Sequence, residues 1–143
     1  MGDAQGQGRL TVPTFFLDEN HCGNPHLHAV FIAAGVPFEK HTDYFSRGVD
    51  DTVWIPEIAR RHWAVLTADT RIRHNALERD AVKRHRLRFF YFARNDFAGV
   101  EMGEILRKAL PRMIAIGNRE LPPFAASISR NGEVTVRDTF SDL

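Results

Sequence analysis

Short apolar segments alternate with amphipathic segments along most of this chain, and that alternation constrains the fold more than any other feature of the sequence. The apolar segments have the length and composition of buried strands, and they cover residues 14–17, 36–39, 63–67 and 87–93. The segments between them carry apolar residues at helical spacing, and they cover residues 26–34, 51–61 and 72–84. Strands that alternate with helices form βαβ units, which build a parallel sheet with helices on both faces. We therefore predict a three-layer α/β/α fold with a mainly parallel sheet.

The C-terminal third of the chain has a different pattern. Two further helical segments cover residues 99–110 and 111–116, and the second begins with a proline, which fits the first turn of a helix. The last two apolar segments flank Asn131-Gly132, a dipeptide typical of a tight turn between antiparallel strands. These two segments cover residues 124–128 and 133–136. The sequence therefore predicts two helices followed by a C-terminal β-hairpin.

The length and hydrophobic content of the chain indicate one domain. The chain has 143 residues, which leaves little room for a second domain, and 43% of them are hydrophobic, which is enough to bury a core. We expect an N-terminal extension at residues 1–13 and a single domain at residues 14–143, in which residues 94–143 form the helical and hairpin part.

The cysteine content and the N-terminus indicate a cytoplasmic protein. Cys22 is the only cysteine, so no intrachain disulfide can form, and a reducing compartment is expected. Residues 1–10 are polar and contain no apolar run, unlike a signal peptide. The longest nearly apolar stretch, residues 29–38, is too short to span a bilayer. We therefore expect no association with a membrane.

The net charge of +1 conceals an uneven distribution of charge along the chain. Residues 1–59 hold 8 acidic and 3 basic residues, whereas residues 60–94 hold 3 acidic and 10 basic residues. If the fold brings the two segments together, an acidic pocket lies beside a basic rim, which suits a metal ion next to a phosphate chain. Solvated helix faces are the alternative explanation.

Four acidic residues are expected at one end of the sheet. Asp18 and Glu19 follow the first strand, Asp69 follows the third, and Asp51 opens the helix before it. The carboxyl ends of parallel strands meet at one edge of the sheet, where ligands bind. Crowded carboxylates need protons or a cation, and oxygen ligands without His or Cys favour Mg²⁺ or Mn²⁺. We predict that Asp18, Asp51 and Asp69 bind the metal and that Glu19 orients a water or a second ion.

Each of these acids also has a structural explanation. Asp50 or Asp51 can cap the second helix, and Asp69 can cap a helix that begins near Thr70.

A zinc site is a further possibility to weigh near the first strand. The histidine and cysteine residues that follow this strand do not have a familiar zinc-binding spacing, and they are His21, Cys22, His26 and His28.

Three motifs in this order resemble the PIN-like domain superfamily. They are Phe-Phe-Leu-Asp-Glu-Asn at 15–20, Gly-Val-Asp-Asp-Thr-Val-Trp-Ile-Pro at 48–56 and Val-Leu-Thr-Ala-Asp-Thr-Arg-Ile-Arg at 65–73. The chain looks closest to the compact branch associated with VapC-type toxin ribonucleases, over about residues 14–93. The resemblance implies a Mg²⁺- or Mn²⁺-dependent endoribonuclease that acts on RNA, often as the toxin of a toxin–antitoxin pair.

Carried over to this sequence, the catalytic acids of the family fall on Asp18, Asp51 and Asp69, with Glu19 as a less certain member. Larger members carry a further acid along the central helix, for which Glu78 is the only candidate, and we do not include it among the predicted ligands.

Substrate contacts are expected next to these acids. Arg71 and Arg73 follow Asp69 closely enough to meet a scissile phosphate. Thr67 and Asn20 are the neighbouring polar residues that we expect to contact substrate.

Two other functions stay open. A phosphatase or phosphotransfer domain also places acids after the first strand, but Asn20 stands where one such family needs a second Asp, and Arg94 follows the fourth strand where another needs a Lys. A non-catalytic PIN-like protein that only binds a partner is the second alternative. The helical region from residue 99 to Gly117 could contact an antitoxin or a second copy in a homodimer.

Overall fold

The computed structural model of the protein describes residues 11–141 and contains one six-stranded sheet. Residues 1–10 of the expected N-terminal extension lie outside the described part. The strands are β1 (Phe15–Leu17), β2 (Phe38–Lys40), β3 (Ala64–Thr67), β4 (Arg88–Phe92), β5 (Phe124–Ile128) and β6 (Val134–Asp138). They are arranged in the order β2-β1-β3-β4-β5-β6. The first five strands are parallel, and β6 pairs with β5 in an antiparallel hairpin. The predicted fold class and the C-terminal hairpin are confirmed.

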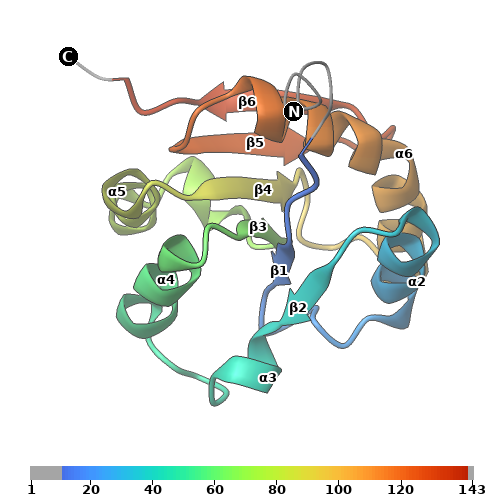
Figure 1. Ribbon diagram of the computed structural model, residues 1–143, viewed down its shortest axis with the longest axis horizontal. Helices are drawn as coiled ribbons and strands as arrows, with labels where there is room; N and C mark the ends of the chain where they lie inside the picture. The colour runs from blue at the N-terminus through green and yellow to red at the C-terminus, as the bar shows by residue number, and fades with distance from the viewer. Residues whose placement is uncertain (1–10, 142–143) are drawn as a thin grey trace, which may run out of the picture.

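Helices cover both faces of the sheet, as Figure 1 shows, with α2 and α6 on one side and α4 and α5 on the other. The helical elements are α2 (Pro25–Ala34), α3 (His41–Tyr44), α4 (Asp51–Arg60), the 3-10 helix η1 (Thr70–Arg73), α5 (Ala76–His85) and α6 (Gly99–Arg119). In the described part, no helix has both the length and the apolar character needed to cross a membrane.

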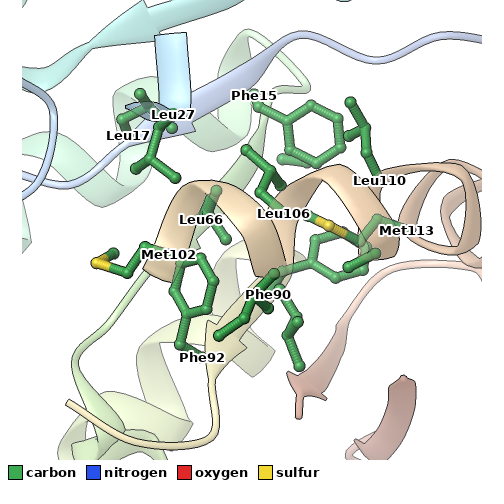
Figure 2. Packing of buried hydrophobic residues seen from close by; sticks show 14 of the residues in the cluster. Phe15, Leu17, Leu27, Leu66, Phe90, Phe92, Met102, Leu106, Leu110 and Met113 are labelled. Carbon is green, nitrogen blue, oxygen red and sulfur yellow. The ribbon is translucent and has the colours of Figure 1, made fainter. Parts of the chain in front are cut away.

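The alternation of side chains along each strand divides the core into two layers. Phe15, Leu66 and Phe90 point toward α2 and α6, where Leu106 and Leu110 pack against them (Figure 2). The residues next to them in sequence point to the other face, toward α4 and α5, and they include Phe16, Val65 and Phe89. Strands buried on both faces read as continuous apolar runs, which is why these strands are visible in the sequence.

Two helix boundaries differ from the prediction. The expected helix at residues 72–84 is two elements, because the side chain of Asn75 accepts a hydrogen bond from the backbone N–H of Glu78 and starts a new helix there. The expected break at Pro111 is absent, and α6 continues through it. Pro111 lies on the exposed side, and the buried stripe stays in phase from Leu110 to Met113. Packing therefore offsets the cost of about 3 kcal/mol for an interior proline.

The close approach of α2 and α6 depends on a glycine. A Cβ atom at Gly103 would lie 2.8 Å from the Cβ of His26. We expect Gly103→Ala to push the helices apart and lower the free energy of unfolding by about 1–3 kcal/mol, as measured by urea denaturation. Gly117→Ala is the matched control, since its Cβ would meet nothing within 4 Å, and it should stabilise the protein by about 0.5–1 kcal/mol. Equal stabilisation by both substitutions would contradict the close packing.

Candidate functional site

A pocket of about 130 Å³ opens at the carboxyl ends of β1 and β3, between α4 and the segment formed by η1 and α5. It forms there because β1 and β3 are adjacent parallel strands that end together. All four predicted acids line it, and so do Asn20, Thr67 and Arg71. The polar residues of the pocket are Asp18, Glu19, Asn20, His41, Asp51, Thr67, Asp69, Arg71 and Glu78. Of the predicted site residues, Arg73 alone is absent from the lining of this pocket, and it lines another one.

Asp18 is the most buried acid at the end of a strand. The hydroxyl of Thr67 donates a hydrogen bond to its Oδ2 atom at 3.1 Å and accepts one from the backbone N–H of Asp69. The other oxygen, Oδ1, is buried and has no hydrogen-bond partner in residues 11–141. Burial raises the pKa of the Asp18 carboxyl to about 6, with a contribution from the negative charge of Asp69, while His21 and Thr67 oppose the rise.

Asp69 is paired with Arg71 inside the pocket. Its Oδ1 accepts from the backbone N–H of Arg71 at 2.9 Å, which caps η1, and its two oxygens accept from the guanidinium at 2.5 to 3.0 Å. The same guanidinium lies 3.7 Å from Glu78 Oε2. Burial alone would raise the pKa of Asp69, but the hydrogen bonds from Arg71 outweigh it and hold that pKa below its ordinary value. The capping role considered for Asp69 is therefore present.

Glu78 also lines the pocket. Its side chain is 11% exposed, and burial raises its pKa to about 7, with additional repulsion from Asp69 and Asp51 and partial compensation by Arg71. A carboxyl group that titrates near neutral pH can accept and return a proton during a reaction. The clue in the sequence is the Asn75-x-x-Glu78 pattern, which places Glu78 in the first turn of α5.

The remaining acids make contacts at the rim of the pocket. Glu19 accepts hydrogen bonds from the backbone N–H of Gly48 at 3.0 and 3.1 Å, so it fastens the loop before α4. Asp51 accepts from the indole N–H of Trp54 at 2.8 Å. Asp50, rather than Asp51, is at the N-cap of α4 and makes no side-chain capping bond there. Asp51 therefore does not occupy the N-cap position, and its side chain lines the pocket.

His41 contributes a buried imidazole that the sequence analysis did not predict. Its side chain is 3% exposed, and Nε2 lies 3.9 Å from Glu19 Oε1. Within the described part of the chain, Nδ1 is buried without a hydrogen-bond partner. Burial lowers the pKa of His41, although the charge of Glu19 opposes this. His41 is on α3, a single helical turn without a hydrophobic period, so no sequence pattern indicates its position.

The chemistry of these side chains fits Mg²⁺ or Mn²⁺. The pocket offers carboxylate oxygens, and Asp18 Oδ1, which accepts no hydrogen bond from the described residues, is an oxygen that could coordinate a cation. Across residues 11–141, however, no three His, Cys, Asp or Glu side chains lie close enough together to hold an ion. This finding covers the histidines near Cys22 as well. In the acidic pocket, Arg71 supplies the positive charge beside Asp69.

Fold and pocket together define an α/β protein that gathers acids where adjacent parallel strands end. A family model described as PIN like domain matches residues 13–94, more than half of the chain, and the chain therefore belongs to the PIN-like domain family. The matched region contains every acid of the pocket. PIN-like domains are commonly metal-dependent nucleases that use Mg²⁺ or Mn²⁺. Searches of curated proteins and of solved structures gave no match.

The raised pKa of Asp18 predicts how stability depends on pH. Its pKa is about 6 in the folded protein against an ordinary 3.8, so the charged carboxylate destabilises the fold above pH 6 and has little effect below pH 4. We expect Asp18→Asn to raise the free energy of unfolding by up to about 3 kcal/mol at neutral pH without metal. The gain should shrink as the pH falls toward 4. Urea denaturation across this range measures it.

Asp43→Asn is the control, because it removes an exposed acid of α3 that does not line the pocket. It should give no pH-dependent gain. A loss of stability in Asp18→Asn at every pH would contradict the prediction, because it would mean that neighbouring groups stabilise the charged Asp18 carboxylate.

Proposed function

We propose that this protein is a Mg²⁺- or Mn²⁺-dependent endoribonuclease of the PIN-like type, and that it acts as the toxin of a toxin–antitoxin pair. The observation that carries the nuclease proposal is the buried, unpartnered oxygen of Asp18 in a pocket shared with Asp51, Asp69 and Glu78. Membership in the PIN-like family supports the same chemistry. The toxin role rests on the resemblance to the compact toxin branch, and the cognate antitoxin and the homodimer stay predictions.

Asp18, Asp51 and Asp69 are the residues that would hold the ion, and Glu78 is the fourth acid in reach of the same pocket. A bound divalent ion supplies an activated water and stabilises charge on the phosphate oxygens. Binding requires that these carboxylates move closer together than they lie in the structure and that Arg71 release Asp69, since the guanidinium now neutralises that carboxylate. When the metal ion replaces Arg71 beside Asp69, one positive charge takes the place of another, so the Asp69 carboxylate is not left uncompensated.

The side chains around these acids have separate tasks in this proposal. The Thr67 hydroxyl fixes one oxygen of Asp18 and leaves the other free. Glu78, with a pKa of about 7, can take the proton from the attacking water. Arg71, once separated from Asp69, can contact the scissile phosphate, because guanidinium groups pair strongly with phosphate oxygens. Glu19 keeps the loop before α4 in place.

The pairing of Arg71 with Asp69 favours a second candidate function. A PIN-like protein whose own arginine permanently neutralises the acids needs no metal and can serve only to bind a partner. Metal binding separates the two candidates. The phosphotransfer alternative has less support, because Asn20 is the third polar residue after β1 and offers no second carboxylate.

The nuclease proposal predicts a metal-dependent activity that requires the acids after β1 and β3. A labelled single-stranded RNA should be cleaved in the presence of Mn²⁺ and left intact with EDTA. Asp18→Asn and Asp69→Asn should each slow cleavage by at least about 100-fold, because each removes a charge from the metal site. Gel electrophoresis of the RNA products over time measures this.

Glu104→Gln provides the control, because Glu104 is an exposed acid on α6, on the other side of the sheet. It should cleave at the parental rate. Cleavage that persists in Asp18→Asn, or that is indifferent to EDTA, would overturn the assignment of this pocket as the metal-dependent site.

A further inference from the structure

A second pocket, of about 340 Å³, lies on the same side of the sheet as the acidic one, over β4, β5 and β6. Its polar lining consists of Arg73, Arg79, Tyr91, Ser127, Arg137 and Asp138. The 3-10 helix η1 connects the two pockets, because Arg71 lines the acidic one and Arg73 lines this one. Ile72 between them is buried and anchors η1 in the core.

A row of hydroxyl groups crosses the sheet from one pocket to the other. Thr67, Tyr91 and Ser127 are direct neighbours on β3, β4 and β5, and all three point to the face covered by α4 and α5. Thr67 donates to Asp18 at one end of the row, and Ser127 accepts from Arg137 Nε at the other, at 2.9 Å. Two strand spacings of about 4.8 Å separate Thr67 from Ser127. A single nucleic-acid strand can span that distance.

The second pocket has an excess of positive charge. Three arginines face one carboxylate, Asp138, which leaves two positive charges uncompensated. Arg79 pairs with Asp138, and its guanidinium lies 5.3 Å from the centre of the Phe140 ring. The Arg73 side chain makes no hydrogen bond or ion pair with any residue between 11 and 141. Its charge is therefore available to a ligand.

The hydroxyl groups of this pocket act as hydrogen-bond donors. Burial raises the pKa of Tyr91, although the three arginines oppose the rise, so its hydroxyl keeps its proton. The hydroxyl has no partner in the part of the chain that the structure describes. Ser127 accepts from Arg137, which leaves its own hydrogen free to donate. Guanidinium and hydroxyl donors that converge on one pocket are suited to a phosphate group.

We propose that Arg73, Arg79 and Arg137, with Tyr91 and Ser127, form a subsite for a backbone phosphate of an RNA strand whose scissile phosphate lies in the acidic pocket. The identity of the ligand rests on the proposed nuclease function, but the anion-binding chemistry does not. The strand passes over η1, with Arg71 on the scissile phosphate and Arg73 on its neighbour. Arg79 is fixed by Asp138, and Arg137 is fixed by Ser127, so two of the three guanidinium groups are already oriented.

The test measures binding without cleavage. Fluorescence anisotropy of a labelled single-stranded RNA is recorded in EDTA, at several salt concentrations, for the parent protein, Arg73→Ala, Arg73→Glu and Arg137→Ala. We expect each alanine variant to weaken binding about tenfold and to lower the salt dependence by about one released counterion. Arg73→Glu should weaken binding further. Inorganic phosphate at high concentration should compete with the RNA in the parent and compete less in the variants.

Arg107→Ala is the control, because Arg107 is an exposed arginine on α6 that lines neither of the two pockets, and it should bind like the parent. The Arg73 side chain is exposed and forms no ion pair with another described residue, so thermal melting should show that its variants are folded. Unchanged RNA affinity in Arg73→Glu would overturn the subsite even if the protein cleaves RNA. Arginine-dependent binding without any Mn²⁺-dependent cleavage would support the subsite and count against the nuclease proposal. Binding of inorganic phosphate, measured by isothermal titration calorimetry, without any binding of the RNA would restrict the pocket to a free anion and overturn the backbone assignment.

Discussion

Asp18 and Asp69 follow neighbouring parallel strands, and the pairing of β1 with β3 keeps their backbones at the same edge of the sheet. Two like charges at such an edge raise each other's energy unless protons or a cation compensate them. The protein uses both solutions. Burial raises the pKa of Asp18 to about 6 and that of Glu78 to about 7, while Arg71 neutralises Asp69. In the proposed nuclease a divalent ion is a third solution, and it would compete with Arg71 for the same carboxylate.

In the proposed nuclease, η1 would link the competition between the metal ion and Arg71 to the binding of substrate. This single turn begins at the N-cap residue Asp69 and places Arg71 and Arg73 in different pockets. A strand of nucleic acid that binds Arg73 brings its neighbouring phosphate toward Arg71. A phosphate is an alternative partner for the Arg71 guanidinium, so substrate and metal would both favour its separation from Asp69. In this proposal, binding of the substrate and binding of the metal would be coupled through η1.

The sequence predicted the strand ends well and the side chains between helices poorly, for physical reasons. Asp18 and Asp69 were found because a fully buried strand ends where polar residues begin. Glu78 was considered only as the counterpart of an acid along the central helix of larger family members and was not included, whereas in the structure Asn75 starts α5 and Glu78 lines the pocket. Arg71 and Arg73 were both expected at the scissile phosphate because they follow Asp69 closely, whereas η1 places them in different pockets.

Contacts between distant segments leave no local pattern at all. Arg79 on α5 meets Asp138 on β6, and Arg137 on β6 meets Ser127 on β5. Neither pair has a spacing that hydrophobic periodicity or capping could reveal. Pro111 shows the opposite case, since a strong local signal for a helix start is overridden by a buried stripe that remains in phase.

In the proposed nuclease, a divalent ion replaces Arg71 as the counter-charge of the acids. Anomalous diffraction from crystals of the protein grown with Mn²⁺ tests it most directly. We expect a manganese peak bound by Asp18 and Asp69, with the Arg71 guanidinium no longer bonded to Asp69. A pocket without an anomalous peak at high Mn²⁺, in which Arg71 still pairs with Asp69, would contradict it.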